Sequence, residues 1–409
     1  MIRIKIRRSI FVRSGPGRNY RALAAVFPSG KLLEMEGIEH GENWKGENRW
    51  FWRLNNKKEK LYYWAGGVEI VDAGISPIQN VATTPYPVKK NWFVNDKYNT
   101  NVINSNAPQN EEEWIVNWGH VDLEIWKIWK TYTRGADVKV AVLDTGISKE
   151  NTNLCKRVNK SLSKNFTNNN TAEIEDTFEA TRYHGTKCAG LIGALGAPIM
   201  GVAPECDLIV YKVTADGNFH IDLFEKAIAD AIRTGVHILS ISVESYGYIE
   251  TWNRLMKDCL NAGIIVVAAA GNSNTPVYAY PASCDTGCFS VGAYYLANNG
   301  SRKVYTENSS HNDRVKFLAP GKDLKTTDKT NTALFSRTSA ATAYSAGVLA
   351  LLKSQYKSAV TYSSILAALQ SGKCTDSIDK TTLKSDYEGY GIINPVLLFQ
   401  YFKNQPIIL

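Results

Sequence analysis

Strongly apolar segments alternate with helical patterns through the middle of the chain. Four segments have the composition of buried strands, and two have the apolar spacing of helices: 138–143, 208–213, 237–243 and 264–269, then 222–233 and 251–261. Buried strands that alternate with helices predict a mainly parallel sheet with helices on both faces. In open sheets of this kind, functional residues lie at the carboxyl ends of strands. We therefore expect an α/β fold over residues 114–409.

Residues 1–72 have a different texture, in which short strand-like runs are separated by turn signals at 14–17 and 28–30. Short strands at this spacing predict a small all-β barrel. Together with Trp50-Phe51-Trp52 and Tyr63-Trp64-Ala65, the pattern resembles bacterial Src-homology-3-like domains. That resemblance implies a module that binds peptides or cell-wall glycans, or that packs against a partner domain. The alternative is that the aromatic side chains only form the core of the barrel.

Charge and cysteine usage limit the partners and the compartment. The net charge of +8 is spread along the 409 residues, so we expect no nucleic-acid partner. The seven cysteines are odd in number and mostly lie among apolar or small residues, which favours a reducing compartment. We see neither a signal peptide nor an apolar run of membrane-spanning length. The chain is expected to be cytoplasmic with no membrane partner, or secreted if a leader has been removed. Whether Cys284 and Cys288 pair is left open.

Four polar residues lie either directly after an expected strand or at the start of an expected helix. Asp144 directly follows the apolar segment 138–143, and Asn272 follows the segment 264–269. His184 heads a helix of small residues, and Ser339 stands at the entry of a helix that runs into an apolar stretch. A serine nucleophile needs a histidine base, a carboxylate that orients the base, and donors for the oxyanion. Alone, Ser339 would be interpreted as a helix cap and Asp144 as a turn residue.

The motifs around these residues occur in one order, Asp, His, Asn and Ser: 140–146, 184–190, 268–272 and 338–347. From about Trp118 to Phe399 the chain resembles subtilisin-family serine peptidases. The resemblance implies the subtilisin fold and a serine endopeptidase that works through an acyl-enzyme. It implies Ser339 as the nucleophile, His184 as general base and then acid, and Asp144 as its orienter. Asn272 and the Ser339 backbone N–H would form the oxyanion hole.

Several positions depart from the family pattern. Lys187 replaces a second histidine, and it either weakens protonation of His184 or faces solvent. Cys188 stands where valine is common. Arg337 replaces a glycine and places bulk and charge beside Ser339. These departures keep one alternative open, which is a catalytically degenerate protein that binds peptides without cutting them. A cell-wall peptidase that acts outside the cell is a second alternative.

The resemblance also implies two substrate-binding segments: Ser242, Val243 and Glu244, and Ala269, Ala270 and Gly271. Glu244 stands where glycine is common. We hypothesise that it lies at the peptide-binding edge and favours basic substrate residues. The alternative is a solvated loop charge.

Two further expectations concern metals and the segment between the domains. Residues 148–154 lack the aspartates expected of a strong calcium site and offer Asn151 and Asn153, so we expect no metal and no cofactor. Residues 73–113 indicate a linker that is rich in Pro, Asn and Thr. It contains the apolar cluster Trp92-Phe93-Val94, which we hypothesise docks at the catalytic cleft and keeps the enzyme latent.

Overall fold

A computed structural model describes two parts of the chain. In the N-terminal part it describes strands at 2–6, 10–13, 22–27, 32–35, 37–44, 47–54, 60–64 and 68–73. In the rest it describes 117–177, 183–196, 199–215, 220–246, 250–297, 300–378 and 384–405. The chain forms two compact units, one of residues 1–95 with 296–301 and one of 96–295 with 302–409, and each is considered by itself. The predicted linker lies largely outside the described residues.

The described strands of the first unit are antiparallel and form two sheets. One has the order β4-β1-β8, and the other has the order β3-β2-β7-β6-β5. Their bounds are β1 Ile2–Ile6, β2 Ile10–Arg13, β3 Ala22–Phe27, β4 Leu32–Met35, β5 Gly37–Trp44, β6 Glu47–Leu54, β7 Lys60–Trp64 and β8 Val68–Ala73. Met35 and Tyr63 are fully buried. The all-β content agrees with the sequence; closure into a barrel and the Src-homology-3-like assignment stay predictions.

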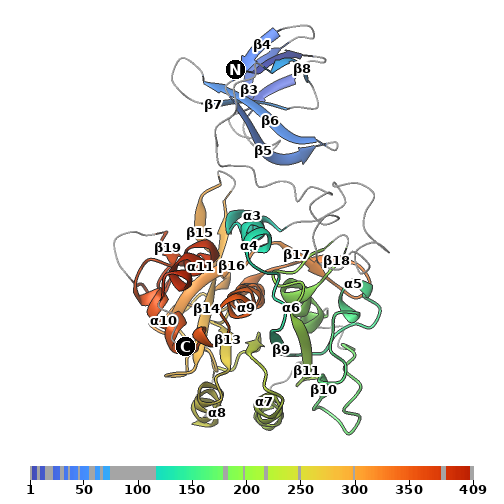
Figure 1. Cartoon of the computed structure of the whole chain (residues 1–409), viewed down its shortest axis with the longest axis vertical. Helices are drawn as coiled ribbons and strands as arrows, with labels where there is room; N and C mark the ends of the chain where they lie inside the picture. The colour runs from blue at the N-terminus through green and yellow to red at the C-terminus, as the bar shows by residue number, and fades with distance from the viewer. Residues whose placement is uncertain are drawn as a thin grey trace. The chain divides into compact units, whose positions relative to one another are not determined.

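The second unit is built on one large sheet (Figure 1), with the order β10-β11-β9-β12-β13-β14-β16-β20-β19 and with β15 paired to β14. The strands from β10 to β20 in that order run parallel, and β19 is antiparallel to β20. Their bounds are β9 Lys139–Asp144, β10 Lys164–Asn165, β11 Asp207–Lys212, β12 Ile238–Ile241, β13 Ile265–Ala269, β14 Cys288–Leu296, β15 Arg302–Val304, β16 Val315–Pro320, β19 Thr375–Asp376 and β20 Ile392–Ile393. The predicted mainly parallel sheet is confirmed.

The remaining elements surround this sheet. The helices are α3 Trp118–Asp122, α4 Ile125–Thr131, α5 Thr152–Cys155, α6 His184–Gly193, α7 Ile221–Thr234, α8 Glu250–Asn261, α9 Arg337–Tyr356, α10 Tyr362–Gln370 and α11 Pro395–Lys403, with short 3₁₀ turns η4 Thr306–Asn308 and η5 Lys357–Ala359. An antiparallel hairpin is formed by β17 Leu324–Thr327 and β18 Thr332–Phe335. None of the helices in the described ranges has the length and apolar character that a membrane-spanning segment needs.

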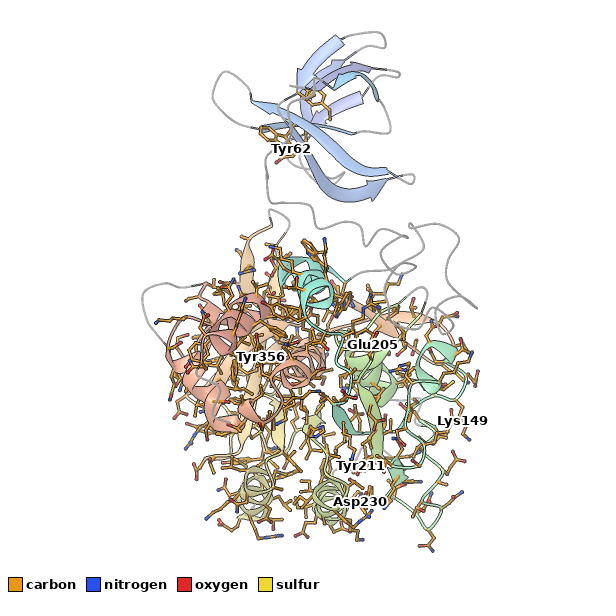
Figure 2. All side chains as sticks on the ribbon, viewed as in Figure 1. Tyr62, Lys149, Glu205, Tyr211, Asp230 and Tyr356 are labelled. Atoms are coloured by element: carbon orange, nitrogen blue, oxygen red, sulfur yellow. The ribbon has the colours of Figure 1, made fainter. Side chains whose placement is uncertain are left out.

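Both faces of the sheet are buried, which explains why its strands are apolar without alternation. Alternate residues such as Ala141 and Leu143 pack in a cluster with Phe224 of α7 and Trp252 of α8. On the same side, Tyr211 of β11 donates a hydrogen bond to Asp230 of α7 (2.9 Å; Figure 2). The intervening strand residues are equally buried and face α6 and α9.

The order in which the chain adds strands to the sheet reverses at β9, and this reversal locates a crevice. After β9 the chain continues to β11 on one side, whereas β12 pairs with β9 on the other side and leads on to β13. Such a switch point leaves a crevice outside the carboxyl ends of the two strands, where ligands bind in open α/β sheets. Asp144 is the last residue of β9, and Ser242 directly follows β12.

Candidate active site

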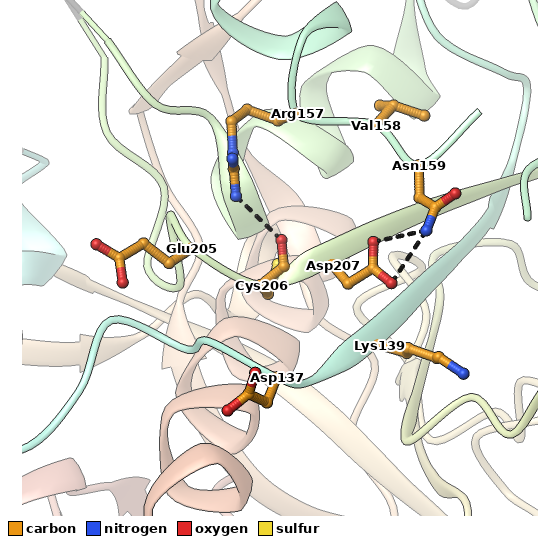
Figure 3. Close-up of a pocket in the computed structure, with 8 residues that line it drawn as sticks. All are labelled: Asp137, Lys139, Arg157, Val158, Asn159, Glu205, Cys206 and Asp207. Carbon is orange, nitrogen blue, oxygen red and sulfur yellow. Dashed lines mark hydrogen bonds between the residues drawn. The ribbon is translucent and has the colours of Figure 1, made fainter. Parts of the chain in front are cut away.

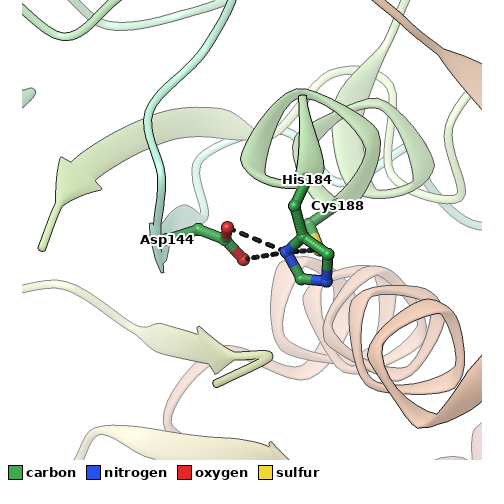
Figure 4. Close-up of side chains that lie close together, drawn as sticks. All are labelled: Asp144, His184 and Cys188. Atoms are coloured by element: carbon green, nitrogen blue, oxygen red, sulfur yellow. Dashed lines mark hydrogen bonds and ion pairs between the residues drawn. The ribbon is translucent and has the colours of Figure 1, made fainter. Parts of the chain in front are cut away.

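Asp144 and His184 form a close pair at this crevice (Figure 4). Nδ1 of His184 lies 2.9 and 3.0 Å from the two carboxylate oxygens of Asp144. Asp144 is 1% exposed and also accepts a hydrogen bond from the Thr145 backbone N–H (2.8 Å). Thr145 in turn accepts one from the Gly185 N–H (2.9 Å), which ties the end of β9 to the start of α6. With Nδ1 donating to the carboxylate, Nε2 is the ring atom left to accept a proton.

The surroundings of this pair shift the pKa of His184. Burial by itself lowers that pKa, but the negative charge of Asp144 opposes burial, and the net pKa lies well above its ordinary value. Cys188 of α6 lies one turn further on, with its sulfur 3.8 Å from His184 Nδ1. Burial raises the pKa of the Cys188 thiol. The thiol is therefore neutral near pH 7, and Asp144 is the partner that charges the imidazole.

Ser339 lies in the first turn of α9 and is 7% exposed. The N-cap of this helix is Ser336, so the alternative that Ser339 is only a cap is wrong. Its Oγ donates to the Ser242 carbonyl oxygen at 3.4 Å, and the Ser242 Oγ donates to the Ser339 carbonyl oxygen at 3.2 Å. The serine hydroxyl is thus held against the end of β12, near the positive end of the α9 dipole.

Asn272 follows β13 and is held from two sides. Its amide oxygen accepts from the Thr338 backbone N–H (3.1 Å) and from the Thr338 hydroxyl (2.8 Å). Its amide nitrogen donates to Glu244 Oε1 at 3.3 Å. Since Thr338 immediately precedes Ser339, these bonds fix the Asn272 amide beside the serine.

The substrate-binding residues expected from the sequence follow neighbouring strands. Ser242, Val243 and Glu244 follow β12, and Ala269, Ala270 and Gly271 close β13, its parallel neighbour. Ala269 and Ala270 are buried, and Gly271 has a φ of 102°. Glu244 is partly buried and its Oε2 atom is buried, which disfavours the alternative of a solvated loop charge.

Lys187 differs from one of the two sequence expectations. It does not face solvent, because it is 8% exposed and pairs with Asp328 at 3.8 Å, and its effect on the protonation of His184 stays a prediction. Arg337 does project to solvent, and its backbone adopts a left-handed φ of 79°.

Two aromatic residues near the site were not anticipated. Phe335 of β18 packs edge-on against the His184 ring, with centroids 5.3 Å apart. Tyr246 lies beside Glu244; burial and the charge of Glu244 raise the pKa of Tyr246 to about 12. The hairpin that carries Phe335 has no marker that links it to the motifs, so the sequence offered no signal for this contact.

Three side chains at the site have atoms that suit metal binding. Asp144, His184 and Cys188 each offer a ligand atom within 4.8 Å of the others, a set that suits a soft divalent ion. Such an ion would compete with the hydrogen bond from Nδ1 to the carboxylate.

Separately, a hollow of about 580 Å³ is lined by residues such as Lys139 and Asp207 (Figure 3). These two residues begin β9 and β11, so the hollow lies at the amino ends of these strands, whereas the candidate active site lies at their carboxyl ends.

Comparison with known proteins gives consistent matches. The model of the subtilase family matches residues 135–391. An intracellular serine protease of Paenibacillus polymyxa is 36% identical over 230 residues, covering 54% of this chain and 68% of that protein. The major intracellular serine protease of Bacillus subtilis (strain 168) is 30% identical over 238 residues, covering 56% and 72%. Subtilisin BL of Lederbergia lenta is 33% identical over 223 residues, covering 54% and 77%.

Proposed function

Because the chain belongs to the subtilase family and is a subtilisin-like serine endopeptidase, we propose that Asp144, His184 and Ser339 are its catalytic triad. Its substrates are proteins or peptides. Ser339 Oγ attacks the scissile carbonyl carbon while His184 Nε2 takes the hydroxyl proton. His184 then returns that proton to the leaving amine, and water hydrolyses the acyl-enzyme by the same route. Asp144 holds the imidazole and stabilises its charged form.

Asn272 and the Ser339 backbone N–H are the proposed donors to the oxyanion. The amide of Asn272 is prearranged for this role because Thr338 holds its oxygen, so that its nitrogen is the atom left to donate. The Ser339 N–H belongs to the first turn of α9, where backbone donors have no partner inside the helix.

The observation that carries the proposal is the contact of His184 Nδ1 with both oxygens of the buried Asp144, next to the helix start that carries Ser339. The Ser339 hydroxyl is turned toward Ser242 O in this state. A rotation about its χ1 angle has to bring it to His184 Nε2 when substrate binds. Such tightening on substrate binding is common in enzymes.

Labelling with a fluorophosphonate probe, read by intact mass, tests the triad. We expect one adduct on the wild type and on Ser345→Ala, and none on Ser339→Ala. Ser345 is a matched control because it lies on the same helix and its hydroxyl donates to Ala341 O. Adduct formation on Ser339→Ala would contradict the assignment. A wild type that is never labelled would favour the degenerate peptide-binding alternative.

We also propose that residues 1–72 recognise substrate or, with the linker 73–113, restrain the peptidase. Support comes from the antiparallel β content of the first unit and from the apolar cluster of the linker. Removal of residues 1–110 is expected to change the rate or the choice of substrates. Unchanged kinetics on both peptide and protein substrates would contradict this role.

A cytoplasmic location is a further proposal. Two relatives are named intracellular serine proteases, and the seven cysteines form no disulfide within the described residues. Fractionation of the producing cells tests it, and recovery of the protein in the medium would contradict it.

A further inference from the structure

Glu244 lies where the reacting end of a substrate must lie. Its Oε1 is 3.3 Å from the Nδ2 atom of Asn272. Its Oε2 is 3.1 Å from the position that a Cβ atom would take on Gly271. Two residues earlier, the Ser242 carbonyl accepts the hydrogen bond of Ser339. The carboxylate is therefore enclosed by the proposed oxyanion donor, the turn after β13 and the strand that touches the nucleophile.

The carboxylate is incompletely satisfied. Oε2 is buried and makes no hydrogen bond of good geometry within the described part of the chain; the phenol of Tyr246 interacts with the carboxylate but brings no positive charge to balance it. A buried carboxylate oxygen without a partner costs free energy, and such atoms in native structures call for an explanation. No lysine or arginine makes an ion pair with Glu244 among the described residues, whereas other acids such as Asp285 and Asp328 do have cationic partners. The missing partner has the chemistry of a cation.

A substrate side chain can supply this cation. The scissile carbonyl carbon must approach Ser339 Oγ to about 3 Å, with its oxygen in hydrogen-bond reach of Asn272 Nδ2. The side chain of the residue that supplies this carbonyl begins two bonds away, and an extended Lys or Arg reaches roughly 6 Å further. Glu244 lies within that reach because its carboxylate already contacts Asn272.

We propose that Glu244 selects Lys or Arg as the residue that supplies the scissile carbonyl, and that it exchanges Asn272 for this cation. Without substrate, the carboxylate accepts the hydrogen bond of the Asn272 amide. When the cationic side chain takes the carboxylate, the amide is released to the developing oxyanion. A neutral side chain leaves Asn272 bound to Glu244 and so meets a weaker oxyanion hole. This inference rests on the proposed roles of Ser339 and Asn272.

Kinetics on the full chain test the selection. Matched peptides with Arg, Lys or Leu at that position are compared for the wild type, Glu244→Gln and Glu244→Ala. Glu244→Gln keeps an acceptor for Asn272 but removes the charge. It is expected to lower kcat/KM for the Arg and Lys peptides by about 30-fold or more and to change the Leu peptide little. Asp222→Asn, an exposed acid of α7, is the control for charge alone.

Glu244→Ala tests the exchange with Asn272. Since Asn272 then loses its internal acceptor, kcat for the Leu peptide is expected to rise. A fall of all three peptides by one common factor would overturn the proposal. So would a wild type that prefers Leu, because Glu244 would then be filling space rather than pairing.

A binding measurement separates this inference from the proposed function. Fluorescence of the cationic probe p-aminobenzamidine is titrated with Ser339→Ala, with and without Glu244→Gln. We expect affinity to fall about tenfold or more when the charge is removed. Equal affinities would overturn the role of Glu244 even if the wild type cleaves peptides. Charge-dependent binding by a chain that is never labelled at Ser339 would instead uphold it and overturn the catalytic proposal.

Discussion

The first residue of α9, the helix that carries the proposed nucleophile Ser339, is held in an unfavourable backbone conformation. Arg337 has a φ of 79°, a region that glycine enters freely and that residues with a Cβ enter at a cost of about 1–3 kcal/mol. Its N–H donates to Gly321 O (2.7 Å), which fixes this conformation. The resemblance led us to expect glycine here, and the left-handed backbone supplies the physical reason for that pattern.

Replacing Arg337 by glycine is expected to stabilise the protein by about 1 kcal/mol, because the φ of 79° is no longer strained. Urea unfolding measures the change. Arg337→Ala is the matched control: it removes the same charge but keeps a Cβ, and it should give no such gain. Equal stabilisation by both variants would show that charge, rather than strain, is the cause.

In the proposed mechanism, the charge of Asp144 sets the pH range of the reaction. Because this charge raises the pKa of His184 above its ordinary value, the neutral base of the wild type forms only at higher pH. Asp144→Asn should move the acid limb of the kcat/KM profile to lower pH. It should also lower kcat about 10⁴-fold, as loss of the carboxylate does in comparable triads. Profiles from about pH 5 to 9 measure this, and an unmoved limb would contradict the assignment.

At the scale of elements, α6 is positioned by glycines that admit close neighbours. A Cβ on Gly190 would overlap Thr327 Oγ1 of the β17–β18 hairpin and lie 2.6 Å from Thr326 Oγ1. These two hydroxyls donate to the carbonyl oxygens of Thr186 and Lys187, both at 2.8 Å. The hairpin therefore buttresses the helix that carries His184.

Gly190→Ala is expected to destabilise the protein by roughly 1–3 kcal/mol, because the added methyl group meets the hairpin. At an unobstructed helix position the same change would stabilise by about 1 kcal/mol. The sign of the change in the free energy of unfolding, measured with urea, therefore distinguishes the two cases. Stabilisation would show that the hairpin moves aside. Peptidase activity should fall in parallel, since α6 carries His184.

At the scale of the whole molecule, a buried histidine links stability to pH. His120 of α3 is 1% exposed, donates from Nε2 to the Met200 carbonyl oxygen (3.1 Å) and accepts at Nδ1 from the Tyr344 hydroxyl (2.9 Å). Burial lowers the pKa of His120 from 6.5 to about 4, against a smaller opposing effect of the Met200 carbonyl. Three distant segments of the second unit therefore meet around a neutral ring.

The free energy of unfolding should fall as pH drops from about 6.5 to 4, because the unfolded chain binds a proton that folded His120 does not. The contribution is present above the unfolded pKa and reaches at most about 3 kcal/mol. His120→Gln should show a shallower fall over this range in urea unfolding. Equal slopes for the two proteins would show that His120 is protonated while folded.

The sequence was sufficient for the features that depend on local order. Apolar runs and helical spacing predicted the strands β9, β11, β12 and β13 and the helices α7 and α8 to within one or two residues. The same reasoning placed Asp144 at a strand end, and His184 and Ser339 at helix starts, as the structure shows. The hairpin β17–β18 was not predicted, because its short strands are only partly apolar.

The sequence by itself determined the parallel α/β sheet and the position of four residues at the ends of its elements: Asp144, His184, Asn272 and Ser339. This was possible because the apolar character and spacing of neighbouring residues indicate burial and the type of element. Only the tertiary structure decided what these residues touch. It pairs Asp144 with His184 across 40 positions and brings Glu244 to Asn272 across 28. Such contacts depend on how strands align and helices pack, and local sequence carries no measure of those distances.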